Sequence, residues 1–169
     1  MKIIILLINM YIISFANIFD IQNLKANFTQ TIKNNSNSVI SYKGNIIFDT
    51  NNILWHYNEP QKNVYISKNE IIIDEPELEQ AIISNINEEL NLISILKESK
   101  KIDDTTYKNT LNNITYTIKI HKNKLQGIFY TDELDNDVSI IFNDVKTNTK
   151  INKDLFVFVA PLHYDIIRK

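Results

Sequence analysis

The chain has 169 residues, with 18 Lys and Arg against 20 Asp and Glu, and a formal charge of −2 at pH 7. This weakly acidic balance gives no field that attracts phosphate groups, so it argues against nucleic acid as a partner. The chain has no cysteine, which excludes a disulfide framework and a lipid anchor attached through cysteine.

The first residues have the features of a secretory signal peptide. Lys2 gives a basic start, an apolar stretch from Ile3 to Phe15 follows, and Ala16 ends it with a small side chain. The stretch is short for a membrane-spanning helix, which needs roughly 20 apolar residues, although the apolar residues beyond Ala16 leave an uncleaved anchor open. We expect residues 1–16 to be a cleaved signal peptide and residues 17–169 to form a single domain.

Apolar and polar residues alternate along most of the remaining chain, which is typical of strands with one apolar face. The expected strands span residues 24–33, 40–48, 53–57, 64–66, 71–73, 114–121, 125–131, 138–145 and 155–159. Because the chain has only two glycines, Asn and Asp must supply most of the left-handed turn positions. The connections are short, so the sequence predicts hairpins and an antiparallel sheet.

One segment, from Asn87 to Ser99, changes to helical periodicity. Its apolar residues Leu90, Leu92, Ile93, Ile95 and Leu96 recur at the spacing of an amphipathic helix. Shorter helical turns are expected at residues 17–23 and 152–155. A large apolar sheet face must be covered, so we expect a mainly β fold, a strongly curved antiparallel sheet with a helical lid. The helix could be a plain core helix or a movable lid over a cavity, and the sequence alone favours the core helix.

Residues with catalytic or metal-binding chemistry are few and scattered. None of the three histidines, His56, His121 and His163, has metal-ligand spacing to another ligand. There is no Gly-x-Ser-x-Gly elbow and no glycine-rich phosphate loop. A lipid hydrolase would need Ser41, Ser67 or Ser139 beside a histidine, and strand parity gives none of them a clear partner. We therefore expect no enzymatic activity, no cofactor and no metal.

Two further features each allow two interpretations. The acidic stretch from Asp74 to Glu79 could be a docking edge for a basic partner or a weak calcium site, but a solvated turn between strands is favoured. Trp55, on the same parity as Ile53 and Tyr57, could contact a ligand or belong to the core.

A series of short motifs resembles the LolA family of periplasmic lipoprotein carriers. In chain order they are Phe28-Thr29-Gln30, Gly44 to Phe48, Leu54 to Tyr57 with Glu59-Pro60, Pro76-x-Leu78-Glu79-Gln80-Ala81, Phe156-Val157-Phe158 with Pro161, and Asp165-Ile166-Ile167. Their order and spacing span nearly all of the mature chain. The chain departs from the family at three places. At Asp49-Thr50-Asn51, many members have a basic residue thought to help hold the lid shut, and near His163 the terminal family glycine is replaced. The span before Leu24 is short, whereas the family usually has a longer first helix there.

The resemblance implies an incomplete β-barrel covered by helices, with a hydrophobic cavity that receives the acyl chains of lipoproteins. It also implies a periplasmic chaperone that carries lipoproteins from the inner to the outer membrane. The implied partners are acylated lipoproteins, an inner-membrane lipoprotein-releasing ABC transporter as donor, and an outer-membrane acceptor that some lineages lack; we expect a monomer. The alternative is a lipid- or lipoprotein-sensing regulatory domain on the same fold.

The inward parity of the expected strands and helix gives a set of candidate lipid-binding residues. They are Phe28, Tyr42, Ile46, Phe48, Ile53, Trp55, Tyr57, Val64, Ile66, Ile71 and Ile73 on the sheet, and Leu90, Ile93 and Leu96 on the covering helix.

Overall fold

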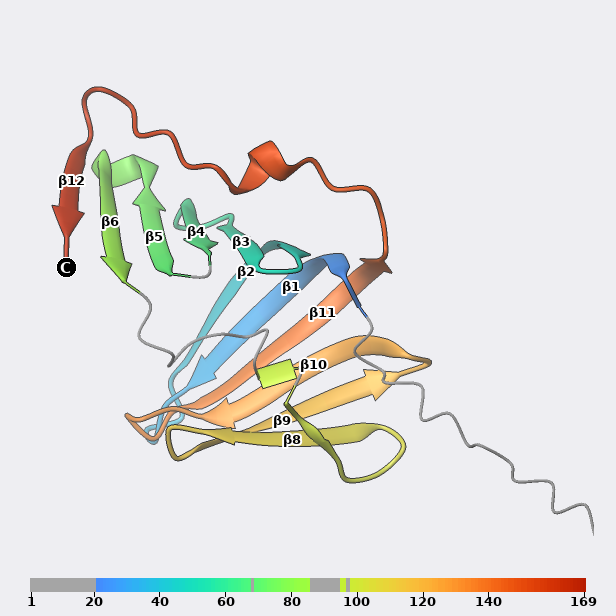
Figure 1. Ribbon diagram of the computed structural model, residues 1–169. Coiled ribbons are helices and arrows are strands. Elements are labelled where there is room, and N and C mark those ends of the chain that lie inside the picture. The colour runs from blue at the N-terminus through green and yellow to red at the C-terminus, as the bar shows by residue number, and fades with distance from the viewer. Residues whose placement is uncertain (1–20, 68, 86–94, 97) are drawn as a thin grey trace, which may run out of the picture.

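The computed structural model describes residues 21–67, 69–85, 95–96 and 98–169, and nearly all of its regular structure is one twelve-stranded sheet (Figure 1). The strands are β1 Asn23–Lys33, β2 Val39–Asp49, β3 Asn52–Tyr57, β4 Lys62–Ile66, β5 Glu70–Glu75, β6 Gln80–Asn85, β7 Lys100–Lys101, β8 Thr106–Leu111, β9 Ile114–His121, β10 Lys124–Thr131, β11 Asp137–Thr147 and β12 Asp165–Arg168. Their order across the sheet is β12-β6-β5-β4-β3-β2-β1-β11-β10-β9-β8-β7. All pairs are antiparallel except β6 with β12. The predicted mainly β, antiparallel fold is confirmed.

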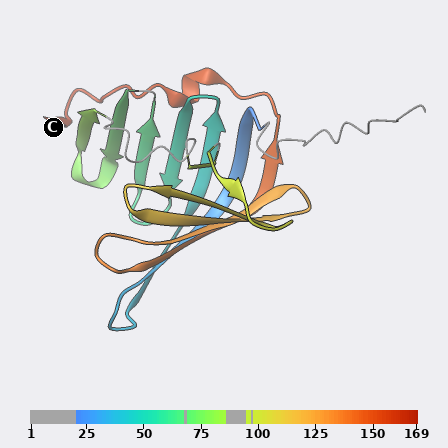
Figure 2. The ribbon, with the colours of Figure 1, turned by 60° about the horizontal axis from the view of Figure 1, so that its bottom comes forward.

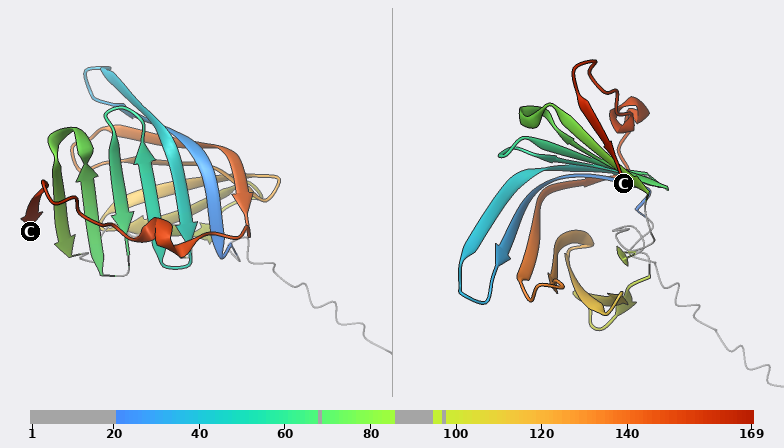
Figure 3. Two further views of the ribbon diagram at one scale, coloured as in Figure 1. Left: turned by 90° about the horizontal axis from the view of Figure 1, so that it is seen from above. Right: turned by 90° about the vertical axis from the view of Figure 1, so that its left-hand side faces the viewer.

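The sheet bends until its two halves face each other across a concave side. Figure 3 shows β3 to β6 forming one arm and β8 to β10 curling round to form the other, with β1, β2 and β11 at the bend. Irregular register between Lys25 and Asn27 in β1, and between Leu125 and Gly127 in β10, adds to the bend, because bulges sharpen strand curvature. The described strands end at β12 on one side and β7 on the other, so the sheet is open and curved.

The turns follow from the shortage of glycine. Positive φ angles occur at Asn37, Asn112, Asn113, Asn123, Asp135, Asp144 and Asn148, together with Thr50, Glu79 and Lys122, and at neither glycine. The expectation that Asn and Asp supply most left-handed positions is confirmed. Gly44 is needed for space instead, because a Cβ atom there would collide with the carbonyl oxygen of His56 and lie 2.9 Å from the ring of Phe28.

The expected helical lid is not supported by the described residues. Ile95 and Leu96 have helical conformation, while the rest of the lid's candidate lipid-binding residues, Leu90 and Ile93, lie outside the described residues. Most of the turn expected at residues 17–23 also lies outside them, and β1 already begins at Asn23. Within the described ranges, no helix is long and apolar enough to cross a membrane.

The segment that follows β11, residues 148–164, crosses the outer face of the sheet before adding β12 beside β6. Figure 2 shows it running past β1 to β6 to that far edge. Its 3-10 helix η3, Lys153–Phe156, confirms the helical turn expected at 152–155. The strand expected at 155–159 is wrong: Phe156 and Phe158 turn toward the sheet, where the Phe158 and Tyr65 rings lie 5.6 Å apart, without pairing as a strand.

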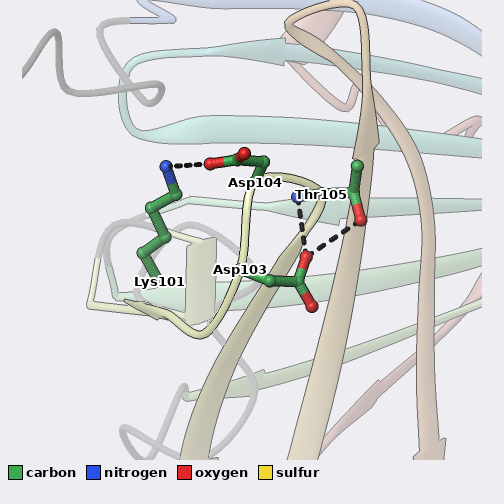
Figure 4. Close-up of polar contacts among 4 residues, drawn as sticks. All are labelled: Lys101, Asp103, Asp104 and Thr105. Carbon is green, nitrogen blue, oxygen red and sulfur yellow. Dashed lines mark hydrogen bonds and ion pairs between the residues drawn. The ribbon is translucent and has the colours of Figure 1, made fainter.

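A short acidic loop joins β7 to β8 at the opposite edge of the sheet. The Asp103 carboxylate accepts hydrogen bonds from the backbone N–H of Thr105 at 2.8 Å and from its hydroxyl at 2.9 Å (Figure 4). These bonds, the backbone one above all, lower the pKa of the Asp103 carboxyl to about 2. Lys101 closes the same loop through an ion pair of 2.8 Å with Asp104.

Candidate lipid-binding cavity

A cavity of about 290 Å³ lies on the concave side, between the two arms of the sheet. Its lining residues are Gln30, Trp55, Tyr57, Val64, Ile66, Ile71, Ile73, Ile95, Tyr116, Ile128, Tyr130 and Ile140. The arm formed by β3 to β5 supplies Trp55 through Ile73, and β1, β9, β10 and β11 supply most of the opposite wall. On the β4–β5 arm, Val64, Ile66, Ile71 and Ile73 are only half-buried, so apolar surface remains available inside the bend.

The cavity is closed at one end of the strands and open at the other. Along the inner face of β1, Leu24 and Phe28 are 3% and 2% exposed, whereas Gln30 and the next inward residue are half-buried. Along β2, exposure rises from 2% at Ile46 to 54% at Ile40. Because β1 and β2 pair antiparallel, the exposure of both strands increases toward the same end, the end with the β1–β2 turn. We call this end of the strands the open end.

Aromatic rings form the floor of the cavity. The Phe28 ring centroid lies 4.9 Å from that of Trp55 and 5.1 Å from that of Tyr57, both in edge-to-face geometry, and Trp55 lies 6.3 Å from Phe142. Phe28 can lie flat across the sheet because its register partner is Gly44, which has no side chain to displace it. Such aromatic contacts are favourable beyond the area they bury, so they stabilise the floor.

Polar groups are confined to the open end. The hydroxyl of Tyr57 donates a hydrogen bond of 3.1 Å to Oε1 of Gln30. Burial raises the pKa of Tyr57 to about 12 and that of Tyr130 to about 12, with smaller contributions from neighbouring tyrosine hydroxyls and, for Tyr130, from the Asp132 carboxylate. Tyr57 and Tyr130 are therefore neutral hydrogen-bonding groups at physiological pH, and among the described residues the ionisable groups of the lining are the phenols of Tyr57, Tyr116 and Tyr130.

The structure divides the twelve candidate residues that it describes into three groups. Six line the cavity: Trp55, Tyr57, Val64, Ile66, Ile71 and Ile73. Four others, Phe28, Ile46, Phe48 and Ile53, are at most 8% exposed and belong to the core beneath it. Tyr42 packs edge-to-face on Tyr57 with centroids 6.1 Å apart, and Leu96 is partly buried against the core. For the residues of all three groups, contact with lipid stays a prediction.

Sequence reasoning missed the wall opposite the predicted one. Gln30, Ile95, Tyr116, Ile128, Tyr130 and Ile140 line the cavity but were absent from the candidate set. Most of them lie on the apolar parity of strands that were themselves predicted, so the signal was present. What the alternation could not show is that β9, β10 and β11 curl round to face β3, β4 and β5.

The outer face holds the acidic and histidine features noted in the sequence. Glu77 and Glu79 are exposed in the turn around the 3-10 helix η1, Pro76–Leu78, as expected for a solvated turn. Asp74 differs, because it is only 6% exposed and accepts a 2.8 Å hydrogen bond from Asn63, which also bonds His56. In the part of the chain that the structure describes, no three His, Cys, Asp or Glu side chains are grouped to hold a metal ion.

Comparison with known proteins gives a consistent result. A family model described as "Outer membrane lipoprotein carrier protein LolA" matches residues 20–159. The outer-membrane lipoprotein carrier protein of Campylobacter jejuni is 39% identical over 155 residues, which cover 91% of each chain. The protein of the same name from Wolinella succinogenes is 30% identical over 172 residues, covering 100% of both.

Solved structures show the same fold at much lower identity. A LolA superfamily protein from Nitrosomonas europaea matches with a TM-score of 0.51 and 10% identity, covering 83% of this chain and 92% of its own. An uncharacterized conserved protein from Thermus thermophilus matches with a TM-score of 0.55 and 10% identity, covering 88% of this chain and 91% of its own. At such identity the likeness extends to the fold alone.

Proposed function

The chain belongs to the LolA family of outer membrane lipoprotein carrier proteins, and from this premise we propose that it binds the acyl chains of lipoproteins in the concave cavity. The observation that carries the proposal is a half-buried apolar wall, Val64 to Ile73, facing a second apolar wall across unfilled space. A protein that only needed a stable core would pack these side chains against each other.

The physical task explains why such a carrier is needed. Burying one CH₂ group is worth about 0.8 kcal/mol, so an acyl chain of about 16 carbons costs about 12 kcal/mol to expose to water. A lipoprotein with two or three chains therefore cannot cross an aqueous compartment unaided. A carrier replaces the water around the chains with apolar side chains, and release requires that its affinity stay moderate.

The size of the cavity supports a carrier that opens. About 290 Å³ lies just below the roughly 300–1,000 Å³ of pockets that enclose drug-sized ligands, so several acyl chains exceed it. Ile95, 4% exposed, lies against the cavity and belongs to the connection between the two arms. In this proposal, the two arms of the sheet separate and Ile95 moves away from the cavity, so that the chains can enter.

The proposal places the mature chain in the periplasm. Residues 1–16 act as a cleaved signal peptide, and residues 17–169 carry lipoproteins from the inner to the outer membrane as a monomer. An ABC transporter of the inner membrane delivers the cargo and an outer-membrane acceptor receives it. Binding and release need no catalytic step, which agrees with a cavity lined by apolar and phenolic side chains.

Native purification tests the proposal. The full-length gene is expressed in a bacterium with an outer membrane, and the mature protein is isolated from the periplasm without detergent. Mass spectrometry is then used to identify any bound species. We expect tri- or diacylated lipoproteins to copurify and to be absent from a parallel preparation of an unrelated periplasmic protein. Recovery of the carrier with unacylated proteins alone would contradict the proposal.

A further inference from the structure

Five polar side chains gather at the open end of the cavity, directly above its apolar lining. They are Gln30 of β1, Tyr42 of β2, Tyr57 of β3, Tyr116 of β9 and Tyr130 of β10, and we call them the tyrosine girdle. Gln30 is the register partner of Tyr42 and accepts the hydrogen bond from Tyr57. The rings of Tyr116 and Tyr130 lie 4.9 Å apart on the other arm.

The two halves of the girdle face the same space, because Gln30 and Tyr57 line one cavity together with Tyr116 and Tyr130. Tyr130 on one arm contributes to raising the pKa of Tyr57 on the other, after the larger effect of burial. Burial also raises the pKa of Tyr116 and of Tyr130. Smaller contributions come from Glu133 for Tyr116 and from Asp132 for Tyr130, and both of these acids lie in the β10–β11 turn. The strand register places these tyrosines at the open end, because Tyr130 pairs with Val138 beside the β10–β11 turn and Val138 pairs with Ile32 near the β1–β2 turn.

The girdle has more hydrogen-bond donors than partners. Of the four tyrosine hydroxyls in the girdle, that of Tyr57 has a hydrogen-bond partner among the described residues, and those of Tyr42, Tyr116 and Tyr130 have none there. Gln30 uses its oxygen as an acceptor, which leaves its NH₂ group available. The buried side-chain oxygens without a partner among the described residues belong to Asp74 and Thr149, so the free hydroxyls of the girdle are accessible at the open end and can donate hydrogen bonds to acceptors that a ligand supplies there.

The position of the girdle defines which acceptors it meets. When an alkyl chain occupies the apolar part of the cavity, the first polar atoms of an acylated ligand are the carbonyl oxygens that join the chain to its head group. The donors of the girdle are neutral, which suits uncharged ester and amide carbonyls. A cation beside it, Lys62, lies over the ring of Tyr57 at 4.7 Å from the centroid, in a cation–π contact.

We propose that the tyrosine girdle binds the ester and amide carbonyl oxygens at the head of the acyl chains, and so sets how deep the chains enter. This inference rests on the proposed function, because it assumes that the chains occupy the cavity. Its consequence is selectivity for acyl over alkyl ligands of equal length. The hydroxyls of Tyr57 and Tyr130 determine this selectivity, and the apolar walls do not.

Two synthetic probes separate the girdle from the walls. Both carry a fluorescent cysteine peptide on a glyceryl group, one with two palmitoyl esters and the other with two hexadecyl ethers, which lack the carbonyls. Binding is measured for the wild-type chain and for Tyr57→Phe, Tyr130→Phe and the double variant. Tyr65→Phe is the matched control, because Tyr65 packs on Phe158 across the outer face.

The wild type is expected to bind the ester probe more tightly than the ether probe. Each substitution in the girdle should weaken ester binding by about 3- to 10-fold, the value of one hydrogen bond, and leave ether binding unchanged. Tyr65→Phe should change neither. Tyr130→Phe is the cleaner variant, since the Tyr57 hydroxyl also bonds Gln30.

The alternatives give distinct results. Equal and tight binding of both probes by all variants would overturn the girdle while leaving the proposed function intact. Binding of neither probe would overturn both. Dihexadecyl phosphate serves as a third probe: if it binds more tightly than the ester probe and Lys62→Met abolishes that preference, the open end is a phosphate site and the girdle proposal is wrong.

Discussion

Ile73→Asn offers a direct test of the cavity wall, because its neighbour Ile72 provides a matched control on the same strand. Ile73 lines the cavity, while Ile72 has the opposite parity, and both are half-buried. Asn is smaller and polar, so either substitution costs some strand stability. Only the one at position 73 alters the surface on which an alkyl chain would lie.

The magnitude follows from what the ligand would cover. Full burial of an Ile side chain is worth about 1.5–3 kcal/mol, and about half of that remains for a ligand to gain at a half-buried position. Burying the Asn amide against an alkyl chain costs about 1–3 kcal/mol more. The sum, about 2–4 kcal/mol, corresponds to binding that is weaker by about 30-fold to several hundred-fold.

The assay is fluorescence titration with a lipid probe that bears a palmitoyl chain and an environment-sensitive dye. Urea unfolding of both variants establishes how much stability each has lost. We expect Ile73→Asn to lose most of its affinity and Ile72→Asn to bind within about 3-fold of the wild type. Equal losses of affinity in the two variants, or a larger loss at Ile72, would refute the assignment of the concave face as the binding wall.

Two further predictions concern the fold around the cavity. Gly44→Ala should lower the free energy of unfolding, measured in urea, by about 1–3 kcal/mol, because the added Cβ meets the His56 carbonyl. Gly127→Ala should cost less, because a Cβ there would lie 3.0 Å from its nearest atom, the carbonyl oxygen of Ile140. A larger loss for Gly127→Ala than for Gly44→Ala would contradict the role of Gly44. Tyr57 and Tyr130 should ionise near pH 12 in a 295 nm absorbance titration. Unfolded tyrosine ionises near pH 10, so the unfolded chain loses these protons first, and the free energy of unfolding should fall as the pH rises from 10 toward 12. The fall should be smaller in Tyr130→Phe. The same fall in that variant as in the wild type would contradict the raised pKa of Tyr130.

The alternation was clearest in the strands whose two faces differ in burial. The alternation of β1, β9 and β11 was plain because one face of each is buried and the other is wet. β6, Gln80–Asn85, was missed because Ala81, Ile82 and Ile83 are consecutive apolar residues and both faces are covered to some extent. β8, Thr106–Leu111, was missed because it is largely polar.

The error at residues 155–159 shows the limit of alternation as a signal. Phe156 and Phe158 are half-buried, while Val157 and Val159 are 62% and 79% exposed, so the alternation of this segment reports burial on one side. It does not report backbone pairing, which this segment lacks. One wall of the cavity was predicted and the other was not, for a related reason. Alternation assigns each residue to a face of the sheet, but whether two distant parts of that face come together depends on the curvature of the sheet.

The central claim is that acyl chains lie between the two arms of the sheet, and photo-crosslinking from adjacent residues of β4 measures this most directly. A benzophenone amino acid is placed at Ile66, which lines the cavity, or at Tyr65, which faces the opposite side. After irradiation of intact cells, position 66 should yield adducts with acylated lipoproteins and position 65 should yield none. Adducts at position 65 without adducts at position 66 would contradict the account.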